Sequence, residues 1–307
     1  MNNQASKAEF KASEPIAYRA RIRDYYLALG YEKPYVWANF AEVPFAKLVK
    51  PLEQCRIAIV TTAAVFKPDA GEQGPGAAYN GAAKFFNVYE MTTAQVPDLC
   101  ISHIAYDRQH TTATDQNSWF PLATLNTFAS EGVIGSVAPE FYGLPTNRSH
   151  RVTQEVDCPE LVRRALAAGV DACVLVPNCP VCHQSVSIAA RQLEASGIAS
   201  VVLGCAKDIV EHVGVPRLVF SDFPLGNAAG KPHDKQSQKD TVMLGLQLLA
   251  GAPAPRCTVQ STQRWSSNEQ WKLDYSNADR LSDEELAARR RDFDLQKQRA
   301  KNPEPRS

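Results

Sequence analysis

Two cysteines three residues apart carry the clearest chemical signal in the sequence. Cys179 and Cys182 lie in the stretch NCPVCHQS, after the apolar run ACVLV and before a segment with helical periodicity. Pro180 is pre-organised for the first turn of a helix, which places Cys179 at or near the N-cap and Cys182 about one turn further on. Backbone N–H groups and the helix dipole stabilise a thiolate there. We therefore predict that Cys179 is a nucleophile and that Cys182 resolves a bond formed at Cys179.

A neighbouring histidine and a metal ion are alternatives that the sequence leaves open. His183 either donates or accepts a proton beside Cys182, or it is a solvent-facing residue of the first helical turn. A structural zinc site needs four ligands, and the single C-x-x-C pair supplies two of them. We expect no bound metal, with zinc as the less favoured alternative, because the spacing of the other candidate ligands does not require a site. Those candidates are His103, His110, Cys205 and His233.

The other cysteines are scattered through the chain. Eight cysteines in 307 residues, without short regular spacings, do not indicate a disulfide framework. Cys173 and Cys100 lie in apolar runs and are expected to be small buried hydrophobes, whereas Cys205 follows the run SVVLG and is expected to face the site. Neither a signal peptide nor an apolar stretch long enough to cross a membrane is present, so we expect a cytoplasmic protein with reduced thiols.

The charge balance narrows the class of partner. The 33 Lys and Arg residues match 33 Asp and Glu residues, so no basic excess points to nucleic acid or to an anionic membrane surface. With 44% hydrophobic residues, the chain has enough apolar side chains for a large core. We therefore expect a small-molecule substrate.

Short apolar runs that alternate with helical patterns must position these residues. In the first half, the run RIAIVTT ends at Thr61 and Thr62 and precedes a Gly/Pro-rich loop over 67–81, which we expect to be a binding loop. The run DLCISHIAYD is a further predicted strand, followed by a helix that ends at Gly132 and by the candidate strand VIGSVAPEFYGL. These patterns indicate a parallel sheet with crossover helices.

The second half reads as a regular β-α-β-α-β run. Right-handed crossovers place the carboxyl ends of its strands on one edge of the sheet, where ligands of open α/β folds bind. Cys179, Cys205 and the loop SDFPLGNAAGKPHD are expected on that edge. Backbone N–H groups around Gly226 and Asn227, together with the threonine hydroxyls after the first strand, are expected to hold a carboxylate.

Four segments follow from these patterns. We predict an N-terminal helical extension (1–54), a first α/β lobe (55–150), a second α/β lobe with the C-x-x-C (151–255) and a polar, charged C-terminal tail (256–307). Both lobes are expected to be Rossmann-like, with mostly parallel sheets and the active site at the strands' carboxyl edge. The tail is expected to be a solvated helix or a partly disordered segment, with homo-oligomer contacts as an alternative.

The stretch GVDACVLVPNCPVCHQSVSIAARQLEASGIASVVLG resembles the region around the selenocysteine of selenoprotein B. Selenoprotein B is the substrate-activating component of glycine, sarcosine and betaine reductases, with relatives in D-proline reductase. Counted back from Glu194, Cys179 matches the selenocysteine and Cys182 the cysteine that follows it. The resemblance covers residues 55 to about 230 and includes upstream positions. Those positions are His103, Tyr106 and Asp107 in SHIAYD, then Asp115 and Asn117.

The resemblance implies a reductive chemistry in which sulfur takes the place of selenium. A thiolate attacks the carbon next to a carboxylate and expels a leaving group, and a second thiol then cleaves the adduct. We predict a thiol-dependent reductase that cleaves a C–N, C–S or similar bond of a small carboxylate or heterocycle. An external thiol reductant or redox protein is the implied partner.

Further residues are assigned around this reaction. His103 and Asp107 are predicted to act as general acids, or alternatively to form a hydrogen-bonded pair that steadies their loop. The predicted substrate contacts are Thr61, Thr62, Tyr106, Cys205, Gly226 and Asn227.

Two rival functions remain at this point. A cysteine-dependent racemase needs a second thiol across the cleft, where this chain has Thr61 and Thr62, although Cys205 can substitute. A non-enzymatic thiol or metal sensor would report through the charged C-terminal helix.

Overall fold

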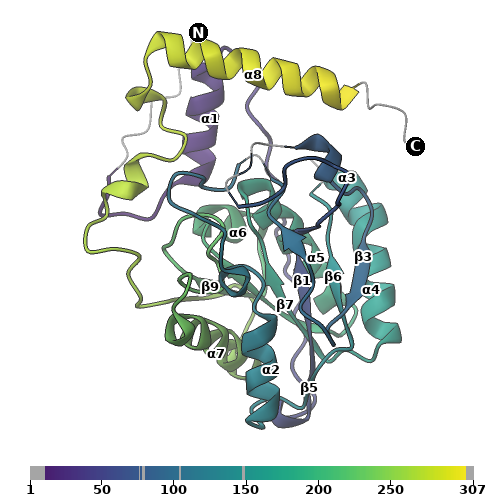
Figure 1. Cartoon of the computed structure of the whole chain (residues 1–307). Coiled ribbons are helices and arrows are strands. Elements are labelled where there is room, and N and C mark those ends of the chain that lie inside the picture. Colours follow the sequence, from purple (N-terminus) through teal and green to yellow (C-terminus); the bar gives the residue numbers. More distant parts are fainter. Residues whose placement is uncertain (1–10, 76, 78–79, 104, 147–148, 302–307) are drawn as a thin grey trace. The chain divides into compact units, whose positions relative to one another are not determined.

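The computed structural model describes residues 11–75, 77, 80–103, 105–146 and 149–301 (Figure 1). The chain divides into two compact units, and each is described by itself. The large unit is Trp37–Trp265, and the small unit combines the chain up to Val36 with the segment from Ser266 onward.

An eight-stranded sheet forms the centre of the large unit, in the order β10-β9-β8-β7-β1-β6-β3, with β5 beside β1. β3 pairs antiparallel with β6, and the other pairs are parallel. The strands are β1 (Arg56–Thr61), β3 (Tyr89–Thr92), β5 (Ser136–Val137), β6 (Glu140–Gly143), β7 (Ala172–Val176), β8 (Ala199–Gly204), β9 (Arg217–Phe220) and β10 (Cys257–Gln260). The predicted α/β class with a mostly parallel sheet is confirmed. The division into two lobes is not, because β1 and β7 are neighbours in the one sheet.

Helices connect the parallel strands and cover both faces of the sheet. They are α2 (Leu122–Ser130), α3 (His150–Val152), α4 (Cys158–Ala167), α5 (Pro180–Ala195), α6 (Lys207–Val213) and α7 (Lys235–Gly251). Every residue of β7, β8 and β9 is buried, as expected for strands covered on both sides. Val202 of β8 belongs to a core cluster with α4 and α5, whereas a Cβ on Gly245 of α7 would meet its neighbour Leu203. Because successive strand residues face opposite sides, α5 and α7 lie on opposite faces.

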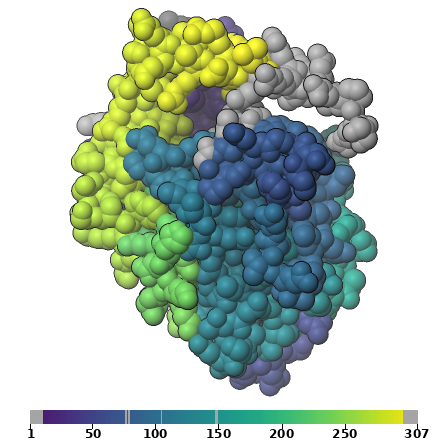
Figure 2. All heavy atoms as spheres, in the orientation of Figure 1, coloured from purple at the N-terminus to yellow at the C-terminus, as the bar shows by residue number. Residues whose placement is uncertain are grey.

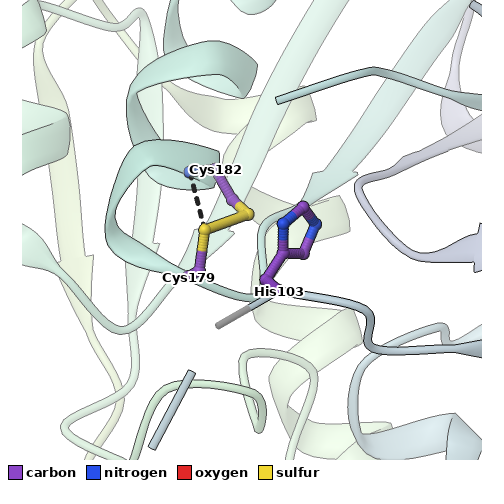
Figure 3. A group of neighbouring side chains, drawn as sticks. All are labelled: His103, Cys179 and Cys182. Atoms are coloured by element: carbon purple, nitrogen blue, oxygen red, sulfur yellow. Dashed lines mark hydrogen bonds between the residues drawn. A yellow bond between two sulfur atoms is a disulfide. The ribbon is translucent and has the colours of Figure 1, made fainter. Parts of the chain in front are cut away.

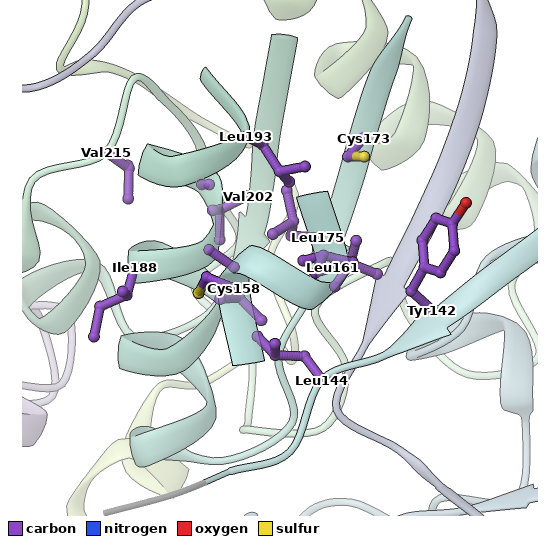
Figure 4. Close-up of a cluster of buried hydrophobic side chains, with 14 of the residues drawn as sticks. Tyr142, Leu144, Cys158, Leu161, Cys173, Leu175, Ile188, Leu193, Val202 and Val215 are labelled. Carbon is purple, nitrogen blue, oxygen red and sulfur yellow. The ribbon is translucent and has the colours of Figure 1, made fainter. Parts of the chain in front are cut away.

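The core cluster beside α4 and α5 fixes the helix that carries the C-x-x-C. Figure 4 shows its members, among them Leu161 of α4, Ile188 and Leu193 of α5 and Leu175 of β7. Burying each such side chain contributes about 1.5–3 kcal/mol. The helix is therefore held along its length against the sheet.

A buried ion pair anchors the carboxyl-terminal end of α5. Glu194 Oε1 lies 2.6 Å from Arg217 Nη1, and both side chains are almost fully buried. The same oxygen accepts hydrogen bonds from the Ser200 N–H and hydroxyl. The Ala46 N–H donates to the other carboxylate oxygen, while Arg217 Nη2 donates to the Ala46 carbonyl at 2.7 Å. The segment before β1 is thus tied to α5 and β9.

Two predicted strands differ from the structure. Among the described residues of DLCISHIAYD, only β4 (Leu99–Cys100) is a strand, and it pairs antiparallel with β2 (Ala64–Val65) in a separate two-stranded sheet. The predicted longer strand is wrong, because the strand ends at Cys100, and His103 beyond it hydrogen-bonds the Thr62 carbonyl. VIGSVAPEFYGL divides into β5 and β6 around Pro139, which has no N–H for a ladder.

In the space-filling view, blue to teal segments form most of the visible face of the large unit (Figure 2). The predicted binding loop over 67–81 belongs to these blue to teal segments. Residues 76, 78 and 79 of that loop lie outside the described residues.

The small unit joins segments about 250 residues apart in sequence. It contains α1 (Tyr18–Ala28) and α8 (Asp283–Lys301), so the predicted N-terminal and C-terminal helices both form. Buried Arg21 donates to the Tyr275 carbonyl at 2.9 Å, and the Tyr31 hydroxyl donates to Asp294 at 2.7 Å. Among the helices of the described residues, none has the length and apolar character needed to cross a bilayer.

Candidate active site

The cysteine pair opens α5, as Pro180 at the first helical position predicts. Cys179 is the N-cap, with extended backbone angles, and its sulfur accepts a hydrogen bond from the Cys182 N–H at 3.2 Å. The Cα atoms of the two cysteines are 4.9 Å apart, and their sulfurs are joined as a disulfide. Cys182 is fully buried, whereas Cys179 retains 4% exposure. The more accessible sulfur therefore stands at the positive end of a 16-residue helix.

His103 lies beside the two sulfurs, with one ring nitrogen on their side (Figure 3). Its Nε2 is 2.7 Å from the Thr62 carbonyl oxygen. A carbonyl only accepts, so Nε2 carries the proton and Nδ1 carries the lone pair of the neutral ring. One ligand atom from each of His103, Cys179 and Cys182 lies within 4.8 Å of the others, and all three residues are buried. The structure thus brings together three residues that the sequence analysis singled out.

Burial controls the protonation of His103. It lowers the pKa of the imidazole to about 4, although the hydrogen bond to Thr62 acts in the opposite direction. The ring is therefore neutral at pH 7. It accepts a proton first, and it acts as an acid only after it has taken one.

His183 is fully buried, so the solvent-facing alternative is wrong. Its Nε2 accepts the Cys205 N–H at 3.0 Å, and its Nδ1 therefore donates to the Cys179 carbonyl at 2.8 Å. Burial lowers the pKa of this imidazole to about 4. With both ring nitrogens occupied, His183 positions the backbone of Cys179 against the end of β8.

Thr61 and Thr62 form hydrogen bonds that hold the backbone around the cysteines. The Thr62 carbonyl accepts from His103, and its hydroxyl oxygen accepts the Asn178 N–H at 3.2 Å. The hydroxyl oxygen of Thr61 accepts the Ala63 N–H at 3.1 Å. Thr62 therefore joins the end of β1 to both the histidine and the cysteine loop.

The sequence analysis missed two residues at this site. Thr146, which follows β6, places its hydroxyl 3.4 Å from Cys182 Sγ. Asn178 directly precedes Cys179, and its fully buried side-chain amide finds no hydrogen-bond partner within the described residues. A usable signal existed for both, since each is a polar residue just beyond a strand that neighbours β1.

Cys205 stands at the end of β8, but it is not part of the group formed by the two sulfurs and His103. Burial raises the pKa of its thiol well above the usual range, against hydrogen bonds from the Asn227 and Phe223 backbones. The Asn227 amide donates to the Thr111 hydroxyl oxygen at 2.7 Å. Gly226 has φ +104°, and an added Cβ would lie 2.9 Å from Thr111 Cγ2. Gly226 and Asn227, in the loop after β9, thus pack closely against Thr111.

Asp107 and Tyr106 belong to the loop that follows β4. Asp107 Oδ1 accepts the backbone N–H groups of Gln109 and His110 at 3.2 and 3.1 Å. These bonds hold Asp107 within its own loop, and the alternative of a hydrogen-bonded pair between His103 and Asp107 stays a prediction. Tyr106 is buried, and the Arg108 guanidinium stacks on its ring at 4.5 Å.

The other buried cysteines are poor nucleophiles. Burial raises the pKa of Cys100 to about 11 and shifts the pKa values of Cys158 and Cys173 well above the usual range. The expectation that Cys100 and Cys173 are buried is confirmed.

Comparison with known proteins decides the family. The family described as glycine/sarcosine/betaine reductase selenoprotein B matches residues 28–178. D-proline reductase subunit gamma of Acetoanaerobium sticklandii is 31% identical over 209 residues, which cover 67% of this chain and 83% of that protein. The chain belongs to the selenoprotein B family. The predicted family and the oxidoreductase class are thus confirmed.

More distant members of the selenoprotein B family are also similar. Sarcosine reductase complex component B subunit beta and glycine reductase complex component B subunit gamma, both of Peptoclostridium acidaminophilum, are 25% and 26% identical over 226 residues. The match covers 71% of this chain and 51% and 50% of those proteins, so the chain spans about half their length. No solved structure matches.

Proposed function

We propose that this member of the selenoprotein B family is a thiol-dependent reductase that cleaves a carbon–heteroatom bond of a small carboxylate or heterocycle. One observation carries the proposal. Cys179 caps a 16-residue helix, within bonding distance of Cys182 and beside the unprotonated nitrogen of His103. This arrangement supports the proposal that, once the pair is reduced, Cys179 acts as a stabilised thiolate, His103 as a base and Cys182 as a resolving thiol.

In the first step, His103 Nδ1 takes the thiol proton of Cys179. The thiolate attacks the carbon next to the substrate carboxylate, a C–S bond forms, and the bond from carbon to the heteroatom breaks. The leaving group departs with the bonding electron pair. The protonated His103 then gives its proton to a leaving group that needs one.

In the second step, Cys182 attacks the sulfur of Cys179. The S–S bond forms while the C–S bond breaks, and the carbon takes the electron pair together with a proton from the solvent. The substrate has gained two electrons and the cysteine pair has lost two. An external dithiol or redox protein then reduces the disulfide by exchange.

A buried amide supports the choice of a carboxylate substrate. The Nδ2 group of Asn178, next to Cys179, has no hydrogen-bond partner in the part of the chain that the structure describes, and the start of α5 adds the positive end of the helix dipole. We propose that these groups hold the carboxylate while Cys179 reaches the adjacent carbon. The predicted substrate contacts stay predictions for all six residues: Thr61, Thr62, Tyr106, Cys205, Gly226 and Asn227.

The names of the relatives suggest substrates and partners. D-proline, glycine and sarcosine carry the carboxylate and an amine on the same carbon, as the proposed reaction requires. A neutral amine is a poor leaving group, so we propose that a partner subunit activates it, in keeping with relatives named as subunits of reductase complexes. Thiol chemistry of this kind needs a reducing compartment such as the cytoplasm.

The test uses a substrate that needs no activation by a partner. Betaine loses neutral trimethylamine when a thiolate attacks its methylene carbon, which leaves a carboxymethyl group on the sulfur. The Cys182→Ser variant, reduced and free of metal, is incubated with betaine, and its peptides are analysed by mass spectrometry. We expect the carboxymethyl group on Cys179, because the adduct forms and no thiol resolves it.

Two controls define the result. Cys179→Ser should give no adduct, whereas Cys257→Ser, which changes a partly exposed cysteine away from the pair, should leave adduct formation unchanged. Alkylation of wild-type protein from pH 5 to 10 should show a Cys179 pKa below the roughly 8.5 of a free thiol. An unlowered pKa together with the absence of any adduct would refute the proposal. Solvent deuterium exchange into an amino acid without added thiol would favour the racemase alternative.

A further inference from the structure

We propose that the reduced cysteine pair and His103 bind a single Zn²⁺ ion, which keeps Cys179 from attacking the substrate while it is bound and which is released when the pair is oxidised to the disulfide. The binding is independent of the reductase reaction, whereas its inhibitory consequence rests on the proposed function. The observation behind it is the approach of two sulfurs and an imidazole nitrogen to within 4.8 Å of one another. These are the donor types that zinc prefers.

The histidine is prepared to be a ligand. A metal-binding imidazole usually donates its other N–H to a carbonyl or carboxylate, which fixes the tautomer and the ring orientation. His103 does so through Nε2 and the Thr62 carbonyl at 2.7 Å, which leaves Nδ1 free to coordinate. Because Thr62 also accepts the Asn178 N–H through its hydroxyl, the ring and the cysteine loop are attached to the same residue.

Each sulfur already has a hydrogen-bond neighbour suited to a metal-bound thiolate. The Cys182 N–H lies 3.2 Å from Cys179 Sγ, and the Thr146 hydroxyl lies 3.4 Å from Cys182 Sγ. Donors of this kind stabilise negative charge on sulfur without competing for the metal. The same contacts would therefore support the zinc complex and the free thiolate.

The charge of the two thiolates favours a divalent cation, and the ligand types favour a metal ion of borderline softness. Two buried thiolates carry two negative charges in a place where an isolated buried charge is costly. A divalent cation neutralises both, and a neutral His103 adds no charge. Sulfur and imidazole ligands favour zinc over magnesium or calcium, which prefer oxygen. Three protein ligands leave the fourth tetrahedral position for water or an added thiol.

The redox state of the pair decides whether the ion binds. In the dithiol form, one Zn²⁺ displaces two protons and forms two Zn–S bonds. In the disulfide form, no thiolate is available, so the ion is released when an external disulfide takes two electrons from the pair by thiol–disulfide exchange and is itself reduced to two thiols. Zinc on Cys179 also occupies the electron pair that would attack the substrate. Binding and the reductase reaction therefore exclude one another.

Metal titration of the reduced full-length protein tests the inference. Co²⁺ is added without oxygen, and thiolate-to-cobalt charge-transfer bands together with the ligand-field bands of a four-coordinate ion report binding. Zn²⁺ should displace cobalt at one equivalent. Competition with a chromophoric chelator should show that His103→Ala weakens zinc binding on the order of 100-fold, at least the loss usual for an outer hydrogen-bond partner.

Matched forms separate binding from misfolding. The oxidised wild-type protein keeps every side chain and should bind no zinc at this site. His233→Ala, which removes a histidine that hydrogen-bonds Thr114, should bind as wild type does. Failure to bind one equivalent, or equal affinity in His103→Ala, would overturn the inference. The betaine adduct on metal-free protein is scored separately, so a failed reductase proposal and a failed metal site give different results.

Discussion

Breaking the buried ion pair of Glu194 and Arg217 should make the stability of the large unit depend on pH. In Arg217→Met, the Glu194 carboxylate keeps its hydrogen bonds from Ala46 and Ser200 but loses the cation 2.6 Å away. Removing one partner of a buried pair costs about 3–5 kcal/mol. We expect the free energy of unfolding to fall by this amount at pH 7.5.

The sign of the pH effect follows from the carboxyl group. Burial already raises the pKa of Glu194 against the opposing effect of Arg217, and removal of the arginine raises it further. A folded-state pKa above the unfolded value favours the protonated native form, so the contribution to stability is present below about pH 4.5 and is lost as pH rises through the folded pKa. The deficit of Arg217→Met should therefore shrink as the pH is lowered from 7.5 to 5.

Urea unfolding followed by circular dichroism at several pH values measures both effects. The double variant Arg217→Met with Glu194→Gln places a neutral amide where the uncompensated charge stood, and it should recover about 1–3 kcal/mol at pH 7.5. Differences between variants cancel the titration of all other groups. A deficit that is constant between pH 5 and 7.5, with no recovery in the double variant, would show that the loss arises from packing and that the charge argument is incorrect.

Three further predictions follow from local geometry. Thr146→Val keeps the shape of the side chain but removes the hydroxyl near Cys182. It should raise the thiol pKa of Cys182 and slow the alkylation of this thiol at pH 7 by up to about tenfold. Thr146→Ser keeps the hydroxyl and should behave as wild type. Gly143→Ala should lower the unfolding free energy by about 3 kcal/mol, because the new Cβ would lie 1.9 Å from the Tyr89 ring, and an unchanged urea midpoint would contradict this. The folded pKa of His183 is about 4, so its contribution to the free energy of unfolding is present above pH 6.5 and is lost as the pH falls to 4. His183→Gln should therefore be less stable than the wild type at pH 7.5, and its unfolding free energy should fall less steeply toward acid pH. Urea unfolding with a chelator present measures both.

The sequence predicted what depends on neighbours along the chain. Pro180 after Cys179 is enough to place a cysteine at a helix start, and continuous apolar runs are enough to indicate buried parallel strands. His103 entered the sequence analysis as a candidate metal ligand and through the family resemblance, and neither fixed the position of its ring beside the sulfurs. Nothing in the residues around it shows that a bond to Thr62 turns it toward them.

Apart from Asn178, which directly precedes Cys179, the missed features depend on contacts between distant segments. Thr146 and Cys182 are 36 residues apart, and their contact arises because β6 and β7 flank β1. His183 was open between two roles because its bond partner, the Cys205 N–H, belongs to the next strand end. The pairing of α1 with the C-terminal segment joins residues more than 250 positions apart, which no local pattern reveals.

The buried cysteines of the core also limit which thiols of this protein can take part in thiol–disulfide exchange. With the pKa values of Cys100, Cys158, Cys173 and Cys205 all raised by burial, almost none of these thiols is ionised at neutral pH. They cannot exchange readily with the disulfide between Cys179 and Cys182, although they belong to the same molecule. Within the fold, the pair is therefore protected from exchange with these four cysteines, and after reduction a thiol-directed probe should react with the pair and with the partly exposed Cys257 before it reacts with them.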